Sequence, residues 1–345
     1  VAMAASAFAA DVSSGTRIDG SIFKYDGGIH FLSEDNASQG YSMPNFSFNA
    51  SGDRAGASLV ITTRGTNDTP SNTVEDLKNQ YVPVMTSQTI WFKPFDMLKI
   101  TVGNGDVALN KETIDWTGST TGIDGRGFYL EFRPVDGLSI DAVLTHNNNG
   151  WWLDKAADGA AAISRMYFKG AYGADFGSIG AYADITPKGN MEFGAGWKNG
   201  GALGPVNTLF IQAIGGFDKD FGLGEIRAEV FANMGFDAIG LGVFVAGGYV
   251  GKNQWIRLDD WWRTGTGANP EEAYVGTVVK LSFPVAGANG YVYIKDTNLL
   301  AKDFSMTIKP GISGNIGAMG WDVAVDITAK KDLTVNVPFT LTVGF

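Results

Sequence analysis

The chain has 345 residues, a net charge of -10, a sequence pI near 4.7 and no cysteine. The acidic balance excludes a nucleic-acid partner that needs a basic phosphate-binding face, and the lack of cysteine excludes disulfides and thiolate metal sites. A mean hydropathy of -0.01 is typical of a water-soluble protein, but a barrel wall with lipid on one side and water on the other has a similar average.

Residues 1–10, VAMAASAFAA, look like the apolar end of a secretory signal peptide, with Ala7-Phe8-Ala9 as a small-x-small cleavage site. This pattern predicts a residual signal peptide, and the alternative is a retained N-terminal extension. No long linker or change of composition interrupts residues 11–345, so we predict that they form a single domain.

From Thr16 onward, strand-like segments recur at short spacing with Gly, Asn, Asp and Pro between them, which is typical of an all-β protein. Apolar and polar residues alternate within them, and charges fall on one face only. In the range 224–234, for example, Glu225, Arg227 and Glu229 alternate with apolar residues. A large soluble β-sandwich or β-helix also alternates, so this pattern alone leaves both architectures open.

The connections between these segments differ in length. Tight turns are expected at 94–97, 134–137 and 175–177, and long connections at 27–43, 65–84, 105–125, 147–162 and 251–272. A barrel with short periplasmic turns and long extracellular loops has this pattern. We count about 18 strands, within a range of about 14–18, which is enough to enclose an aqueous lumen. The longest apolar run, 238–250, is shorter than the roughly 20 residues that a membrane helix needs.

The last eleven residues alternate without a break and end on an aromatic residue. One face of this expected strand carries Val337, Phe339, Leu341, Val343 and Phe345. About ten alternating residues can cross a bilayer when the strand is tilted. This ending resembles the assembly signal of Gram-negative outer-membrane β-barrels.

That resemblance implies a porin-like fold, which is a transmembrane antiparallel up-and-down β-barrel in the outer membrane. It also implies contact with outer-membrane lipid and lipopolysaccharide, and recognition of the C-terminal strand by the outer-membrane assembly machinery. Homotrimers are common in the family, so a trimer is expected.

Placing the polar face of each strand inside the barrel predicts a pore lining of mixed sign. The basic candidates are Lys93, Lys99, Arg133, Arg165, Lys169, Arg227, Lys280, Lys295 and Lys309. The acidic candidates are Glu131, Asp141, Asp184, Glu225, Glu229, Asp322 and Asp326. Some of the basic residues lie beside expected periplasmic turns and are predicted to form a basic ring at the inner mouth: Lys93, Lys99, Arg133, Lys280 and Lys309. The alternative is that these charges pair across neighbouring strands and only stabilise the wall.

The third long connection, 105–125, stands where the porins that this chain resembles fold a loop into the lumen. A constriction loop would oppose the basic wall with Asp106, Glu112, Asp115 and Asp124. The characteristic loop motif of those porins is not recognisable here, so an ordinary external loop is the alternative.

Two of the long connections carry paired tryptophans. Exposed indoles beside charged residues can stack on sugar rings, and the candidates are Trp151, Trp152, Trp255, Trp261 and Trp262. The alternative is an interfacial girdle, or packing between loops and subunits.

The sequence carries no motif that supplies a catalytic nucleophile with its base, no phosphate-binding Gly-rich loop and no zinc motif. We therefore expect no enzyme activity and no cofactor. The prediction is an outer-membrane porin with a water-filled channel for passive diffusion of small hydrophilic solutes and ions. Two alternatives remain open: a sugar-selective porin that uses the loop tryptophans, and a structural or adhesive surface barrel with little transport.

Overall fold

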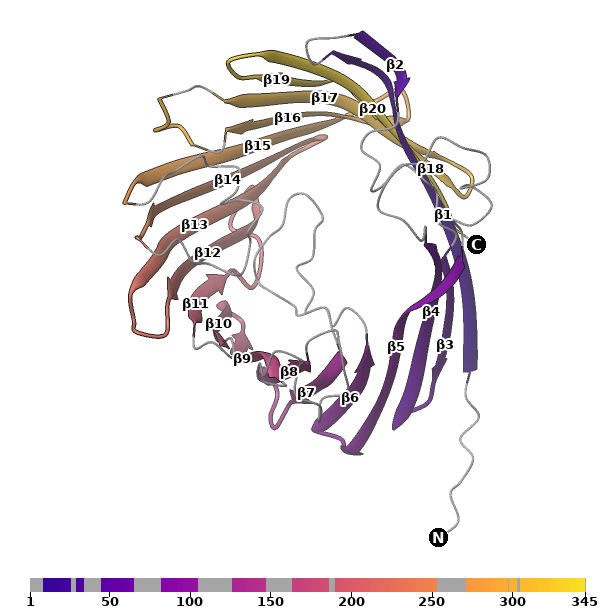
Figure 1. Cartoon of the computed structure of the whole chain (residues 1–345), viewed down its shortest axis with the longest axis vertical. Helices are drawn as coiled ribbons and strands as arrows, with labels where there is room; N and C mark the ends of the chain where they lie inside the picture. The colour runs from indigo at the N-terminus through magenta and orange to yellow at the C-terminus, as the bar shows by residue number, and fades with distance from the viewer. Residues whose placement is uncertain are drawn as a thin grey trace. The chain divides into compact units, whose positions relative to one another are not determined.

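The computed structural model describes residues 9–25, 29–33, 45–64, 82–104, 126–146, 163–185, 190–252, 271–296, 298–302 and 305–344 (Figure 1). All regular elements of these residues are β-strands. The described part of the chain holds no helix with the length and apolar character that spanning a membrane requires. The all-β prediction is confirmed.

Twenty strand segments succeed one another along the described residues. They are β1 (Ala9–Tyr25), β2 (Ile29–Ser33), β3 (Asn45–Ser51), β4 (Ala55–Arg64), β5 (Val82–Phe95), β6 (Leu98–Asn104), β7 (Arg126–Phe132), β8 (Leu138–His146), β9 (Ile163–Ala174), β10 (Gly177–Ile185), β11 (Met191–Lys198), β12 (Val206–Phe217), β13 (Leu223–Phe236), β14 (Ile239–Val250), β15 (Ala273–Val285), β16 (Ala288–Asp296), β17 (Met306–Ile316), β18 (Met319–Ala324), β19 (Asp326–Ala329) and β20 (Leu333–Gly344).

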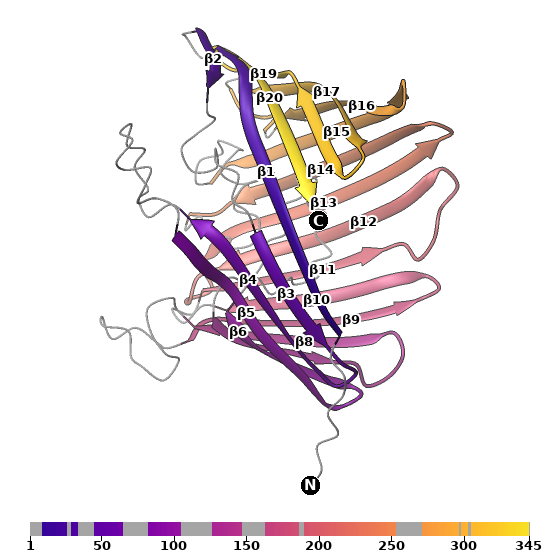
Figure 2. The same ribbon diagram turned by 90° about the vertical axis from the view of Figure 1, so that its right-hand side faces the viewer.

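Strands that are consecutive in the sequence pair antiparallel from β3 to β5, from β6 to β15, and between β17 and β18. Figure 2 shows β9 to β14 side by side as successive hairpins. Short turns make this order possible, because antiparallel neighbours need only a few connecting residues. In the turn between β15 and β16, Ala286 and Gly287 both have positive φ, 47° and 85°. Two such residues are the requirement of a type I′ turn, whose twist matches that of the flanking strands.

The three predicted tight turns are confirmed, since they coincide with the connections β5–β6, β7–β8 and β9–β10. The predicted long connection at 27–43 is wrong in one respect. It contains β2, whose residues pair with the end of β1, for example Ile29 opposite Tyr25.

Two strand positions are each shared by two segments. Tyr25 of β1 lies between β2 and β20, and Gly15 of β1 lies between β3 and β20, so β2 and β3 occupy the same edge of β1. Similarly, β18 and β19 both pair with β20 in one continuous register. When each pair counts as one strand, the twenty segments of the described residues occupy 18 positions. The predicted count of about 18 is confirmed.

The break between β18 and β19 has a chemical cause in the flanking strands. By register, Pro310 of β17 lies opposite Val325, and Pro338 of β20 lies opposite Ala324. Proline has no N–H group and cannot donate to the ladder. Between Pro310 and Val325, therefore, Pro310 acts only as an acceptor. The Val325 N–H donates to the Pro310 carbonyl at 2.9 Å.

The first and last strands are hydrogen-bonded neighbours. β1 pairs antiparallel with β20 from Gly15 opposite Gly344 to Tyr25 opposite Val335. This contact removes the free edges of both terminal strands, as a closed up-and-down barrel requires.

The chain divides into two compact units. Unit 1 comprises Val1–Phe92, Phe283–Val292 and Thr307–Phe345, and unit 2 comprises Lys93–Ser282 and Tyr293–Met306. Each side-chain cluster of the candidate site lies within one unit.

Candidate functional site

The charged residues of β13 are buried, and the apolar residues that alternate with them are exposed. Glu225, Arg227 and Glu229 are at most 4% exposed, whereas Ile226 and Val230 are 48% and 42% exposed. This is the reverse of a sheet in a soluble protein, whose apolar face lines the core. It is the arrangement of a sheet whose apolar face meets lipid. We call the face with Glu225 the inner face and the face with Ile226 the outer face.

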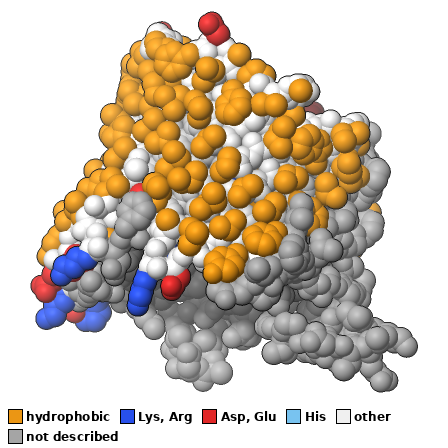
Figure 3. Space-filling view, turned by 90° about the horizontal axis from the view of Figure 1, so that it is seen from above, with side chains coloured by type: hydrophobic (Ala, Val, Ile, Leu, Met, Phe, Trp, Pro, Cys, Tyr) orange, Lys and Arg blue, Asp and Glu red, His pale blue; other side chains and the backbone are white. Residues whose placement is uncertain are grey.

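The outer face continues over the neighbouring strands of unit 2. Large apolar side chains are exposed there, including Ile140, Phe168, Ile179, Phe193, Ile211 and Val245. Figure 3 looks onto a different part of the molecule, from the top of Figure 1 where β16, β17 and β19 lie, and there too apolar side chains cover most of the described surface and charged ones lie near its margin. The alternative of a soluble sandwich or helix is therefore contradicted.

On the inner face of β12, β13 and β15, polar side chains form a connected network. Arg227 is fully buried and lies between two carboxylates, with Nε at 2.6 Å from Oε1 of Glu229 and Nη1 at 3.7 Å from Oε1 of Glu225. The amide of Gln212 donates to Glu229, and the hydroxyl of Tyr274 donates to Glu225. Hydrogen bonds to its polar atoms offset part of the cost of burying an ion pair, and Gln212 and Tyr274 each supply one such bond.

A second group of charges pairs across β6, β7 and β8. Lys99 Nζ lies 2.8 Å from Oε2 of Glu131, and Arg133 Nη1 lies 2.7 Å from Oδ1 of Asp141. The basic partners are the more exposed ones, since the side chains of Lys99 and Arg133 are 34% and 43% exposed against 22% and 9% for Glu131 and Asp141. In these two pairs the basic groups are presented to the surroundings and the acidic groups are held against the wall.

Tyr182 of β10 illustrates how a carboxylate is held. Tyr182 lies directly opposite Gly194 of β11, and its ring occupies the space of the missing side chain, because a Cβ on Gly194 would lie 2.2 Å from the ring. The ring thereby reaches Glu192, to which its hydroxyl donates at 3.0 Å. Glu192 is fully buried and lies opposite Asp184, which is also fully buried.

Two further tyrosines repeat this arrangement. Tyr274 lies opposite Gly248, where a Cβ would lie 2.7 Å from the hydroxyl, and it reaches across β14 to Glu225 on β13. Tyr291 of β16 lies over Gly311 of β17, where a Cβ would lie 2.3 Å from the ring, and its hydroxyl lies 2.9 Å from both carboxylate oxygens of Asp322 on β18. We call these three sets of tyrosine, glycine and carboxylate the tyrosine latches. Their common feature is a glycine that lets a ring lie flat on the neighbouring strand.

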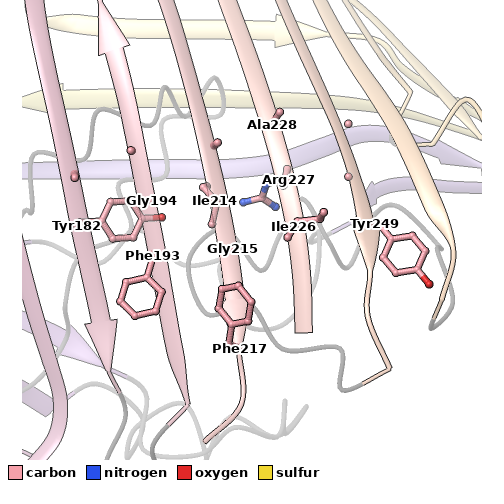
Figure 4. A pocket seen from close by; sticks show the side chains of 15 residues that line it. Tyr182, Phe193, Gly194, Ile214, Gly215, Phe217, Ile226, Arg227, Ala228 and Tyr249 are labelled. Carbon is pink, nitrogen blue, oxygen red and sulfur yellow. The ribbon is translucent and has the colours of Figure 1, made fainter. Parts of the chain in front are cut away.

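The outer face of unit 2 carries an apolar hollow of about 800 Å³. Small residues on five successive strands lie directly opposite one another along it: Ala181, Ala195, Ala213, Ala228 and Gly247. The rings of Phe193, Phe217 and Tyr249 lie along one margin (Figure 4). Because the small side chains stand between large ones, the surface is recessed across the strands.

Solved structures of outer-membrane channels share this fold. Pseudomonas aeruginosa OccK2 (OpdF) is 11% identical, with a TM-score of 0.64 and coverage of 97% of each chain. Pseudomonas aeruginosa OccK9 (OpdG) is 11% identical, with a TM-score of 0.64 and coverage of 97% of this chain and 98% of that one. Acinetobacter baumannii OccAB2 is 10% identical, with a TM-score of 0.63 and the same coverage. No protein-family model and no curated protein matches the sequence.

The chain has the fold of a Gram-negative outer-membrane porin. The predicted transmembrane antiparallel up-and-down β-barrel is thereby confirmed. In a porin fold one face of each strand meets lipid and the other faces the lumen. The apolar outer face and the charged inner face of β13 agree with this arrangement.

The paired strands bring several predicted pore-lining residues together. Lys99, Glu131, Asp141 and Lys169 lie directly opposite one another across β6 to β9. The others are spread along the chain: Lys93 on β5, Arg133 directly after β7, Arg165 on β9, Asp184 on β10, Glu225, Arg227 and Glu229 on β13, Lys280 on β15, Lys295 on β16, Lys309 on β17, Asp322 on β18 and Asp326 on β19. The side chain of Arg165 lies outside the described residues. For Glu131, Asp141 and the β13 charges, the contacts agree with the alternative in which they pair within the wall.

The predicted basic ring is wrong in two of its members. Lys93 and Lys99 flank the turn 96–97, and Arg133 comes directly after the end of β7. In contrast, Lys280 lies inside β15 opposite Gly242, and Lys309 lies near the start of β17, away from the turn at 317–318. Both lysines lie several residues along their strands from the nearest tight turn. The spacing of residues in the sequence did not show where these strands begin and end.

Sequence reasoning missed several inner-face residues. These are Glu192, Gln212, the latch tyrosines and an apolar cluster in which Phe210, Phe231, Phe244 and Val278 lie directly opposite one another. The inner face is therefore not polar throughout. For Glu192 a signal existed, because Phe193, Ala195 and Trp197 alternate with it along β11.

Other predicted residues lie outside the described part of the chain. These are the constriction-loop candidates Asp106, Glu112, Asp115 and Asp124, the tryptophans Trp151, Trp152, Trp255, Trp261 and Trp262, residues 1–8 and Phe345. Ala9 and Ala10 are the first residues of β1, whereas the signal-peptide interpretation placed them in the leader. Val337, Phe339, Leu341 and Val343 lie in β20, where Leu341 stands between Ile18 and Trp321. Among the residues that can be described, no group of three or more His, Cys, Asp or Glu is placed to hold a metal ion.

Proposed function

We propose that this chain is an outer-membrane porin that allows small hydrophilic solutes and ions to diffuse passively through a water-filled lumen. The observation that carries the proposal is the reversal of faces on the porin strands, with charged residues such as Arg227 on the inner face and apolar residues such as Ile226 on the outer face. The outer face would contact lipid and lipopolysaccharide.

This function requires no chemical step. Backbone groups of neighbouring strands hydrogen-bond to one another, so the wall can stand in lipid without unsatisfied donors. Solutes would cross down their gradients, and the exposed heads of Lys99 and Arg133 would act on them more strongly than the less exposed carboxylates of the wall. We also propose that the alternating residues of β20 serve as the signal for the outer-membrane assembly machinery.

Conductance measures this function directly. Purified, folded protein inserted into a planar lipid bilayer in KCl is expected to give discrete and stable current steps, because an aqueous lumen conducts ions. The control is the same preparation after heat denaturation, which removes the barrel. Folded protein that inserts without any current would contradict the porin and favour a structural or adhesive surface barrel.

The oligomer is a separate proposal. We propose that the chain forms a homotrimer whose subunits meet at the outer hollow, because small residues let two membrane surfaces approach closely. Light scattering in detergent is then expected to give three times the mass of one chain. Filling the hollow with Ala195→Trp and Ala213→Trp should yield a monomer, whereas Ile140→Trp, on the outer face outside the hollow, should not. A monomeric wild-type protein would contradict this proposal.

A further inference from the structure

We propose that the latch tyrosines Tyr182, Tyr274 and Tyr291 set the ion selectivity of the channel by holding three carboxylates against the wall. The inference rests on the proposed porin function and deepens it. Each tyrosine is a positioning residue, because it acts on permeating ions only through the carboxylate that it binds.

The three latches share one geometry. In each of them, a ring lies over a glycine of the neighbouring strand and the hydroxyl donates to a carboxylate. Packing of a tyrosine ring against a glycine does not by itself require a hydrogen bond from the hydroxyl to a carboxylate. All three sets have this hydrogen bond. The repeated combination indicates that the glycine and the tyrosine together place the acid.

The latches also change which charges are exposed. Glu192 and Glu225 are fully buried although they lie on the inner face, whereas Lys99 and Arg133 keep about a third or more of their side chains exposed. A pore is selective through the charges that ions meet in it. The latches of Glu192 and Glu225 therefore lower the negative charge that reaches the lumen without changing the net charge of the chain, whereas the latched Asp322 is half-buried.

Loss of a latch hydroxyl should release its carboxylate. A buried carboxylate that loses a donor is strongly destabilised, and rotation of its side chain toward water relieves the cost. Glu225 has a second partner in Arg227, so its release should be the smaller one. The Asp322 latch is a direct test because both oxygens of Asp322 lie at hydrogen-bond distance from Tyr291, and the Glu192 latch tests a fully buried carboxylate.

The experiment measures reversal potentials across a KCl gradient for wild type, Tyr182→Phe and Tyr291→Phe. Each variant keeps its ring and should fold and give discrete current steps as the wild type does. The K⁺/Cl⁻ permeability ratio is expected to rise about fourfold, since one unit negative charge across roughly 10 Å of water raises the local K⁺ concentration and lowers the local Cl⁻ concentration by about twofold each. Tyr249→Phe on the outer face is the matched control and should leave the ratio unchanged.

A second variant separates positioning from general disturbance of the wall. Combining Tyr182→Phe with Glu192→Gln removes the released charge, so the rise in permeability ratio should disappear. Labelling of carboxylates by a water-soluble carbodiimide and an amine, with detection by mass spectrometry, should modify Glu192 in Tyr182→Phe and spare it in the wild type.

Three outcomes would overturn the inference: an unchanged ratio in conducting Tyr182→Phe and Tyr291→Phe channels, a rise that persists in the double variant, or equal labelling of Glu192 with and without the hydroxyl. Conducting wild-type channels with unchanged variants would refute the latches and leave the porin intact. Wild-type protein that does not conduct would refute both.

Discussion

Replacing Arg227 with methionine is expected to lower the free energy of unfolding by about 3–5 kcal/mol. Arg227 is fully buried between Glu225 and Glu229, so its removal takes away the positive charge that it supplies to two buried carboxylates. The measurement is equilibrium unfolding in guanidinium with phospholipid vesicles, monitored by tryptophan fluorescence.

Two controls test the cause of this loss. Lys219→Met removes a charge from the turn between β12 and β13, where Lys219 and Asp220 form an exposed pair at 2.7 Å that raises the pKa of Lys219, and no measurable loss of stability is expected. Adding Glu225→Gln and Glu229→Gln to Arg227→Met should recover much of the loss, because the uncompensated charges are then gone. A triple variant no more stable than Arg227→Met would show that lost packing, rather than charge, is responsible.

Gly248→Ala is expected to lower the free energy of unfolding by about 1–3 kcal/mol, the range for forcing an extra methyl group into a packed site. The new Cβ would lie 2.6 Å from the carbonyl oxygen of Ile226 and 2.7 Å from the hydroxyl of Tyr274. One of the two contacts is with backbone, so movement of a flexible side chain cannot relieve it. The same guanidinium titration measures the change.

Gly170→Ala is the matched control within a strand. A Cβ on Gly170 would have nothing within 4 Å. Alanine in an open strand position is more favourable than glycine by roughly 0.5–1 kcal/mol, so this variant should be as stable as the wild type or slightly more stable. If both variants lost the same stability, the tyrosine latch would not explain the need for glycine at position 248.

Local sequence patterns were sufficient to specify the strand character of the chain and the two faces of its strands. Alternation has a period of two residues, and the Cβ direction in a strand has the same period, so a short segment is enough to place Glu225 and Ile226 on opposite faces. The approximate number of strands and the tight turns could be predicted from turn residues, which are also local. The sequence signal for a barrel was the C-terminal alternation together with the many repeats.

Which inner-face residues meet could be seen only in the folded chain. Tyr274 and Glu225 are 49 residues apart in the chain, and Tyr291 and Asp322 are 31 apart. Their contact depends on strand register and on a glycine between them, neither of which a single strand reveals. Register also places Lys280 and Lys309 away from the tight turns, and it aligns two prolines of neighbouring strands with the break in the ladder at Val325. Local periodicity thus specifies the face that a residue occupies, whereas the partners on that face depend on pairings between strands that are distant in the sequence.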